Sequence, residues 1–443
     1  MVFVFLGLVV GVLGGAHYYL WRRLVRDVSA PRGVYRRVGT ALAVVLPLLA
    51  VAGQTAGRME APFVVQQLLA WPGLMWFALL VYLLLALLAL EPVRPLARRL
   101  LARRAARAER PAPAPEPRQE LVTAPQGTGT VPADASGPTD APEGPGRPSA
   151  EPPPGSTRAA PDGPGPSDPS RRLFVARTAA VTAGVVAAGT VGYGTYSMLG
   201  VGPRLKRVTV PLAKLPRGAH GYRIAVVSDI HIGPVLGRGH TQRIVDVINR
   251  VNADAVAIVG DLVDGSVADL GPAAEPLARL RSRDGAYFVT GNHEYFSGAE
   301  QWVDHMRELG VRPLENERVE LAGFDLAGVN DIAGEDYGDG PDYEAALGDR
   351  APERASVLLA HQPVMIHDAV EHGVDLQLSG HTHGGQMWPG TYLADLANPT
   401  LAGLERYGDT QLYVTRGAGA WGPPVRVGAE PDITVVELAA RGA

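Results

Sequence analysis

Short polar motifs in the C-terminal half of the sequence carry residue types that bind metal ions. In chain order they are Asp-Ile-His, Gly-Asp, Gly-Asn-His-Glu, a single His and Gly-His-Thr-His. Oxygen and imidazole ligands without thiolate suit borderline divalent ions such as Mn, Fe or Zn. The chain has no cysteine, which excludes thiolate metal sites, cysteine nucleophiles and disulfides. The candidate residues are Asp229, His231, Asp261, Asn292, His293, His361, His381 and His383.

Each motif directly follows a short apolar segment of the kind that forms a buried strand. These segments alternate with amphipathic stretches such as 241–251, which predicts an α/β domain over about 204–443. Ligands of such sheets gather at the carboxyl ends of the strands, so we expect the motifs to meet at one rim. The predicted strands are 223–228, 255–260, 286–290, 319–329, 356–360, 374–378, 411–415 and 432–437.

The order of the motifs suits a pair of divalent ions. Two cations about 4 Å apart repel each other, and a shared carboxylate offsets this repulsion. Asp261 stands in the middle of the series and is the natural bridging residue. Asp229 and His231 can reach the same ion, whereas the two histidines of Gly-His-Thr-His can reach one ion or two. The neutral amide of Asn292 completes a ligand set without adding negative charge.

The five motifs, in this order, resemble those of the calcineurin-like metallophosphoesterases, and the resemblance covers about 204–443. The segment SRRLFV and the endings GHTHGGQ and LYVTRGAGAWGPPVR look like the membrane-associated YkuE-like branch. The resemblance implies a four-layer α/β/β/α sandwich with two divalent metal ions at the strand ends. It further implies that one ion binds Asp229, His231, Asp261 and His383, and the other binds Asp261, Asn292, His361 and His381.

The resemblance also implies a mechanism, in which a water or hydroxide bridging both ions attacks phosphorus. His293 would protonate the leaving group or stabilise the transition state, and the alternative is a purely structural role. Asp264 stands where purple acid phosphatases have a tyrosine, and Gly265-Ser266 replaces the Arg-Gly of protein serine/threonine phosphatases. Both of those subfamilies are therefore disfavoured. Asp264 is either a partner that fixes a ligand imidazole or a turn residue.

The N-terminal region, 1–110, is predicted to be an all-α transmembrane region. Arginines are concentrated in 21–39 and after residue 90, which places both segments in the cytoplasm. The three uncharged apolar runs predicted to be spans are 2–20, 40–55 and 71–90, of which 40–55 is short and interrupted by Pro47.

A linker and a further apolar segment connect this region to the α/β domain. Residues 111–170 are rich in Pro, Gly, Ala and Ser, which predicts a disordered linker. Residues 171–199 begin with two arginines and are predicted to be a twin-arginine-type export signal or a fourth transmembrane helix. Both interpretations place 204–443 outside the cytoplasm, on a multi-pass protein of the cell membrane. No Ala-x-Ala cleavage pattern follows, so we expect a retained anchor.

One apolar segment bears on the substrate. Met387, Trp388, Tyr392 and Leu393 follow two candidate ligands directly, and they favour an amphiphilic phosphoester, unless they only pack the loop. The net charge of −4 excludes a globally basic nucleic-acid-binding protein, and no nucleic-acid partner is expected. The hypotheses are therefore a membrane-anchored phosphodiesterase or phosphomonoesterase, a surface nuclease or nucleotidase, and a non-catalytic membrane scaffold that retains the fold.

Overall fold

The computed structural model describes residues 2–57, 59, 61–108 and 169–441. It divides into two compact units, one made of 1–91 with 176–443 and the other of 92–175. The predicted linker, 111–170, lies outside the described residues except for its last two. Those two already belong to helix α5 (Pro169–Thr195), so the predicted boundary of the linker was two residues too late.

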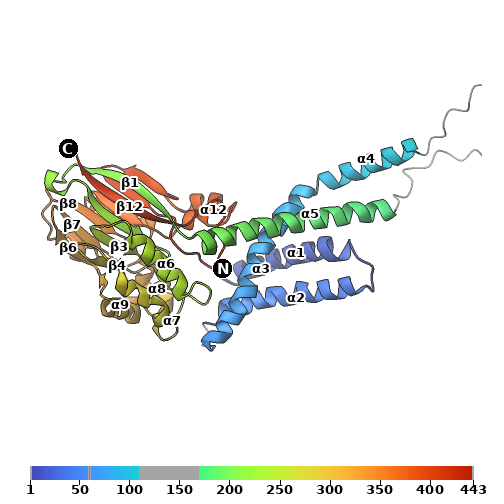
Figure 1. Cartoon of the computed structure of the whole chain (residues 1–443), viewed down its shortest axis with the longest axis horizontal. Coiled ribbons are helices and arrows are strands. Elements are labelled where there is room, and N and C mark those ends of the chain that lie inside the picture. Colours follow the sequence, from blue (N-terminus) through green and yellow to red (C-terminus); the bar gives the residue numbers. More distant parts are fainter. Residues whose placement is uncertain (1, 58, 60, 109–168, 442–443) are drawn as a thin grey trace, which may run out of the picture. The chain divides into compact units, whose positions relative to one another are not determined.

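The C-terminal domain contains two six-stranded sheets (Figure 1). The strand order is β1-β12-β2-β3-β4-β5 in the first sheet and β10-β11-β9-β8-β7-β6 in the second. Strands β2 to β5 run parallel, as do β7, β8, β9 and β11, whereas β12 is antiparallel to β2. The strands are β1 (Arg204–Leu212), β2 (Tyr222–Val227), β3 (Ala255–Val259), β4 (Ala286–Val289), β5 (Arg312–Pro313), β6 (Glu317–Leu321), β7 (Phe324–Gly328), β8 (Ala355–Leu359), β9 (Leu376–Ser379), β10 (Gly403–Tyr407), β11 (Thr410–Val414) and β12 (Asp432–Ala440).

The central strands are apolar on both faces because each face is covered. Side chains of a strand alternate between its two faces. In β2, Ile224 and Val226 therefore pack into the core between the sheets, while Ala225 and Val227 pack into the outer core beneath the helices. This double burial explains why the strand segments read as continuous apolar runs instead of alternating patterns.

Helices complete a four-layer α/β/β/α sandwich, which confirms the predicted fold class. The first sheet is covered by α6 (Arg238–Asn249), α7 (Val267–Ala274) and α9 (Ala299–Glu308), which share its outer core. The second sheet is covered by α10 (Tyr343–Leu347) and α11 (Ile366–Glu371). Of two further helices, α8 (Asn292–Ser297) begins within the Gly-Asn-His-Glu motif, and α12 (Gly390–Ala397) follows the Gly-His-Thr-His motif.

The prediction of one strand over 319–329 was wrong. The segment is a hairpin, in which β6 and β7 pair antiparallel and the chain turns at Gly323. Gly323 has φ of +99°, a conformation that glycine adopts without strain. The sequence analysis also missed β1, β5 and β10; β1 carries charged residues on its exposed face and pairs in parallel with β12.

The N-terminal region consists of α1 (Val2–Trp21), α2 (Val34–Thr55), α3 (Phe63–Leu90) and α4 (Val93–Ala108). Three helical segments of the described chain are long and apolar enough to cross a membrane, and they are Val34–Thr55, Phe63–Leu90 and Arg171–Val201. The helices that contain the second and third predicted spans, 40–55 and 71–90, begin before those spans. The helices begin at Val34 and Phe63, and Pro47 lies inside α2 without ending it.

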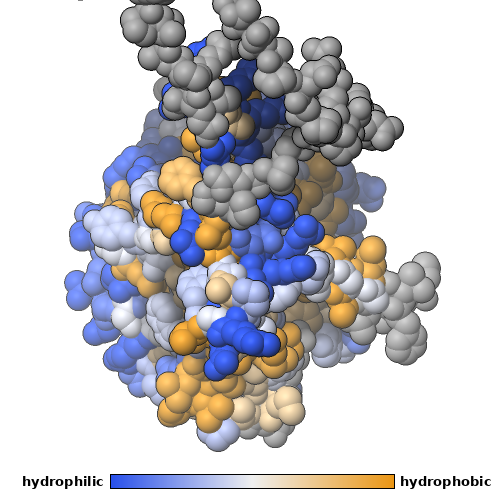
Figure 2. Space-filling model, turned by 90° about the vertical axis from the view of Figure 1, so that its right-hand side faces the viewer, coloured by the Kyte–Doolittle hydropathy of each residue, from blue (hydrophilic) through white to orange (hydrophobic). Residues whose placement is uncertain are grey.

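The apolar helices present much of their hydrophobic surface outward, as lipid-facing helices do. No residue of α2 is buried, and Val44, Leu48 and Val51 are among its exposed apolar side chains. Figure 2 shows clusters of hydrophobic residues beside hydrophilic ones on the face that it draws. Large exposed apolar surfaces of this kind are costly in water and are covered by lipid in membrane proteins.

Candidate metal centre

The predicted motifs all lie at the carboxyl ends of parallel strands. The structure brings every predicted site residue to this rim, although the residues come from both sheets. Strand β2 leads to Asp229 and His231, β3 to Asp261, β4 to Asn292 and His293, β8 to His361, and β9 to His381 and His383.

Three overlapping groups of side chains have their ligand atoms within 4.8 Å of one another. Asp261 belongs to two of these groups. Its Oδ2 atom lies 3.2 Å from Nε2 of His361 and 3.8 Å from Nε2 of His231. Asn292 contacts the third group through its Oδ1 atom, which lies 3.1 Å from Nδ1 of His381. The groups are Asp229, His231 and His383; His231, Asp261 and His293; and Asp261, His361 and His381.

Several of these residues have an unusual backbone conformation. A positive φ is uncommon for residues with a side chain and is strained outside special contexts. At this rim the sharp turns after the strands point the side chains towards one another. The strained backbone therefore positions the candidate ligands. The φ angles are +50° at Asp229, +49° at His231, +51° at Asp261, +72° at His381 and +52° at His383.

Glycines beside the ligands allow close approach of the chain. A Cβ atom on Gly291 would lie 2.4 Å from both the amide nitrogen and Oδ1 of Asp261. A Cβ atom on Gly380 would lie 2.5 Å from Oδ2 of Asp229. Only glycine, which has no Cβ atom, fits at these two positions.

The donor set fits divalent cations. His361 is fully buried, and its Nδ1 lies 2.8 Å from the carbonyl oxygen of Val259. Since that carbonyl can only accept, Nδ1 carries a proton and Nε2 of the neutral ring presents a lone pair. This Nε2 has no hydrogen-bond partner in the described structure and faces the carboxylate of Asp261. A lone pair facing a buried carboxylate is unfavourable unless a proton or a metal ion lies between them.

Asp264 holds two imidazoles at once. Its Oδ1 atom lies 2.8 Å from Nδ1 of His231 and 2.7 Å from Nδ1 of His293. Burial raises the pKa of the Asp264 carboxyl, but His231 and His293 outweigh this and keep its pKa well below the usual range. Both rings therefore donate through Nδ1, and Nε2 of His231 is left to bind an ion. Of the two roles considered for Asp264, the structure supports the imidazole partner.

Glu294 anchors the turn that carries Asp261. Its Oε2 atom accepts from the amides of Gly291 and Asp261 at 2.6 and 2.9 Å, and Oε1 accepts from Leu262 at 2.8 Å. Burial and the neighbouring Asp261 carboxylate raise the pKa of Glu294 to about 7. The sequence analysis quoted Glu294 only as part of a motif and assigned it no role.

Arg426 is buried and contacts His383. Its Nη1 donates to the His383 carbonyl at 2.7 Å, and its Nη2 lies 2.9 Å from Nδ1 of the same ring. A guanidinium has only donors, so Nδ1 of His383 accepts. Burial and the charge of Arg426 hold the pKa of His383 well below its ordinary value. In the uncharged ring the proton then lies on Nε2, 3.3 Å from Oδ1 of Asp229, and an ion bound at this nitrogen would displace that proton.

His293 lies at the outer side of the group and borders exposed aromatic rings. Burial lowers its pKa, but the carboxylates of Asp264 and Asp261 outweigh burial and raise it to about 9. The ring centroid lies 5.8 Å from that of Phe296 and 6.2 Å from that of Trp421. These two residues come from distant parts of the sequence, so no sequence pattern could have placed them together.

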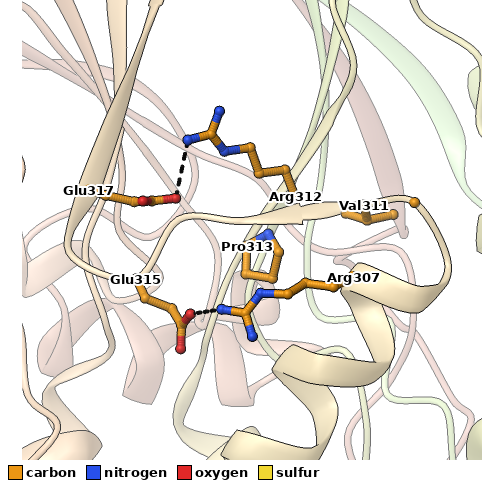
Figure 3. A pocket seen from close by; sticks show the side chains of 7 residues that line it. Arg307, Val311, Arg312, Pro313, Glu315 and Glu317 are labelled. Carbon is orange, nitrogen blue, oxygen red and sulfur yellow. Dashed lines mark hydrogen bonds and ion pairs between the residues drawn. The ribbon is translucent and has the colours of Figure 1, made fainter.

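A separate pocket lies away from this rim, between the end of α9 and the start of β6. It is lined by Arg307, Gly310, Val311, Arg312, Pro313, Glu315 and Glu317 (Figure 3). Two ion pairs, Arg307 with Glu315 and Arg312 with Glu317, cross it. None of its lining residues belongs to the metal-binding groups, and its charges already satisfy one another.

Comparisons with known proteins match the domain that carries the rim. The family described as calcineurin-like phosphoesterase matches residues 222–385, which contain all eight predicted site residues. A transmembrane protein with metallophosphoesterase domain from Danio rerio is 40% identical over 250 residues, 53% of this chain and 57% of that protein. An uncharacterized metallophosphoesterase of Aquifex aeolicus is 34% identical over 54% of this chain and 93% of that protein. The uncharacterized metallophosphoesterase YkuE of Bacillus subtilis is 31% identical over 61% of this chain and 97% of that protein. The chain thus spans little more than half the length of its fish relative.

Proposed function

We infer that this chain, which belongs to the calcineurin-like metallophosphoesterase family, is a membrane-anchored hydrolase of phosphoesters that uses two divalent metal ions. The observation that carries the inference is the convergence of three ligand groups at one rim, linked through Asp261 and His231. A scaffold that had lost activity would be expected to lack a ligand, and here all eight predicted positions are present and adjacent.

The residues divide into two ligand sets that share Asp261. Two ions held there would supply an activated hydroxide and neutralise charge on the phosphoryl oxygens. In our proposal Asp229, His231, Asp261 and His383 hold one ion. Asp261, Asn292, His361 and His381 hold the other.

His293 is proposed to act on the leaving group. Asp264 fixes its ring through Nδ1, so that Nε2 is the nitrogen left to contact substrate. A protonated Nε2 there can donate its proton to the departing oxygen, which lowers the cost of bond breaking. The exposed rings of Phe296 and Trp421 border the same place.

The active domain is proposed to lie outside the cytoplasm. Arg23 pairs with Glu91 at 2.9 Å, and Arg177 donates to the carbonyl of Val28 at 3.1 Å. These contacts join the first part of α5 to the C-terminal ends of α1 and α3. The arginine distribution assigns those two ends to the cytoplasm. The opposite end of α5 then continues into β1 on the outer side. Arg171 and Arg172 would serve as the export or orientation signal.

The substrate is proposed to be a lipid-type phosphoester. Trp388, Tyr392 and Leu393 are exposed and follow closely after His383. Apolar side chains beside a polar metal centre on a membrane protein suit a substrate with a phosphate head and an apolar tail. A nucleotide is the second candidate, favoured by Phe296 and Trp421, because exposed rings beside a phosphate site can stack on a base.

The reaction class is tested with the full chain purified in detergent. Bound metal is measured by mass spectrometry, together with hydrolysis of p-nitrophenyl phosphate and bis-p-nitrophenyl phosphate. Asp261→Asn should lose metal and both activities, whereas Asp304→Asn, at an exposed position of α9, should keep both. Full activity of Asp261→Asn without bound metal would refute the proposal.

The substrate is tested by substitutions that leave the ligands in place. The double variant Trp388→Ser, Leu393→Ser should reduce hydrolysis of a lipid phosphoester in mixed micelles far more than that of p-nitrophenyl phosphate. Val370→Ser, an exposed apolar position on α11, is the control. Equal losses on both substrates would exclude the lipid. A selective loss of nucleotide hydrolysis in Phe296→Ser or Trp421→Ser would favour the second candidate.

A further inference from the structure

The helix α12, which follows the last candidate ligands, exposes an apolar face. Tyr392, Leu393 and Leu396 are 66%, 73% and 85% exposed, and no residue of α12 is buried. Residues three and four positions apart share a face of a helix, so these three side chains form one apolar stripe. Thr391 and Asp395, also four apart, lie on the other side. This arrangement is that of an amphipathic helix whose apolar face lacks a partner within the described chain.

The start of α12 is tied to a second loop. The amide of Trp388 donates to the carbonyl of Val427 at 2.8 Å, and the amide of Val427 donates to the carbonyl of Gln386 at 2.9 Å. The Gln386 side chain adds bonds to the carbonyls of Trp421 and Pro423 at 2.9 and 3.0 Å. The loop 421–428 therefore fixes where α12 begins.

The same loop rests on the end of α5. The amide of Arg426 donates to the carbonyl of Gly194 at 3.2 Å. A Cβ atom on Gly194 would lie 2.6 Å from Val425 and 2.8 Å from Val427, so the loop lies directly against the helix backbone. Val425 also shares an apolar cluster with Val191 and with residues of α3. The loop thus links α12 to two apolar helices that are long enough to span a membrane.

The position of Gly194 along α5 indicates how deep in the bilayer the loop 421–428 lies. Arg177 and Gly194 are 17 residues apart, which is about 26 Å along an α-helix. The hydrocarbon core of a bilayer is about 30 Å thick. With Arg177 at one interface, Gly194 therefore lies close to the opposite one. Val427 and the start of α12 then lie at the level of the lipid headgroups.

We propose that α12 lies in the outer interface of the bilayer, with Tyr392, Leu393 and Leu396 inserted at the boundary between headgroups and acyl chains. The occupant of the apolar face is thus the membrane that α3 and α5 cross. His381 and His383 precede α12 closely, so this placement brings the metal centre to the membrane surface. The inference rests on the proposed membrane spans and not on the hydrolytic activity.

The absence of cysteine allows a direct test with the full chain. Single-cysteine variants Leu396→Cys and Leu393→Cys are labelled with an environment-sensitive fluorophore and reconstituted in phosphatidylcholine–phosphatidylglycerol vesicles. Glu353→Cys is the control, because Glu353 is exposed at the end of β8 opposite His361. Quenching is measured with lipids spin-labelled near the headgroup and with aqueous iodide.

The proposal predicts opposite behaviour for the two kinds of position. Probes at 393 and 396 should show blue-shifted emission, strong quenching by the shallow spin-labelled lipid and severalfold weaker quenching by iodide than the probe at 353. Equal iodide quenching at all three positions would overturn the proposal. Two positions on α12 are used so that one misfolded variant does not decide the outcome.

A second copy of the chain is the other possible cover for α12. The labelled variants are therefore also placed in nanodiscs that hold a single copy. Protection from iodide that persists there, together with lipid quenching, supports insertion into the bilayer. Protection that disappears in single-copy discs would show that another copy covers α12, and this would also overturn the proposal.

Discussion

Asp264 lies 2.8 Å from His231, measured from Oδ1 of the carboxylate to Nδ1 of the ring. The same oxygen accepts from Nδ1 of His293 at 2.7 Å. One carboxylate thus sets the proton position of a candidate metal ligand and of the candidate leaving-group acid. This coupling gives the acidic residue at position 264 a role in orienting both rings.

Removing this carboxylate should weaken metal binding and catalysis together. Asp264→Ala frees both rings to rotate and to exchange protons between nitrogens. Loss of such an outer partner typically costs about 10–100-fold in metal affinity or activity. Metal affinity is measured by competition with a chelator, and kcat/KM with an aryl phosphate. Asp269→Ala on nearby α7 should change neither quantity. An Asp264→Ala variant with unchanged affinity and activity would show that the two contacts are not functional.

The positions of the ligands could be predicted from the sequence because strands buried on both faces are continuous apolar runs. Strand β2 illustrates this: from Ile224 to Val227 its inner and outer residues are all apolar, so its end, and hence Asp229, is marked clearly. Edge strands give no such signal. Strand β1 begins with several charged residues and pairs with a strand more than two hundred positions away, and it was missed.

The supporting contacts could not be predicted because they join residues that are distant in sequence. Arg426 and His383 are 43 positions apart, and Asp264 and His231 are 33 apart. A single sequence shows the residue types but not which loops meet. The exposure of α12 was also hidden, since an apolar stripe at helical spacing predicts a buried face equally well.

Glu294 should stabilise the turn at Asp261 independently of bound metal. In Glu294→Gln the NH2 group that replaces one carboxylate oxygen cannot accept, so at least one of the backbone N–H groups of Gly291, Asp261 or Leu262 loses its partner. An unsatisfied buried donor costs about 1–3 kcal/mol. The apparent melting temperature in detergent should therefore fall, both with metal and after chelation. Glu308→Gln, at an exposed position of α9, serves as the control, and a drop seen only with metal would contradict this reasoning.

Stability should depend on pH through His240 in α6. The side chain is buried, and burial lowers its pKa to about 3. The unfolded chain, with a pKa of about 6.5, binds a proton below that pH that the folded chain does not bind. The free energy of unfolding therefore falls as the pH decreases from about 6.5 towards 3. The loss from this residue is about 1.4 kcal/mol between about pH 7.5 and about pH 5.5.

The contribution of His240 is isolated by comparison with His240→Leu. Leucine does not titrate, so a fall in pH should lower the free energy of unfolding of the native protein more than that of His240→Leu. Both proteins are melted across this pH range after metal has been removed with a chelator. Release of metal with falling pH then contributes to neither curve. Parallel curves for the two proteins would mean that another group dominates.

Arg416 should contact the phosphoryl group of the substrate. It follows β11 at the same rim, and its side chain lies over Gly384, whose Cβ would be 3.0 Å from Cγ of Arg416. Within the described part of the chain its guanidinium forms no hydrogen bond or ion pair. A cation beside the metal centre stabilises charge that develops on the phosphoryl oxygens, and losing one such group typically costs about 10²–10³-fold in kcat.

Arg416→Ala should therefore lower kcat/KM strongly while bound metal stays unchanged, and Arg416→Lys should recover part of the loss. Arg406→Ala on exposed β10 is the matched control. A variant that lost metal along with activity would instead assign Arg416 a structural role at His383.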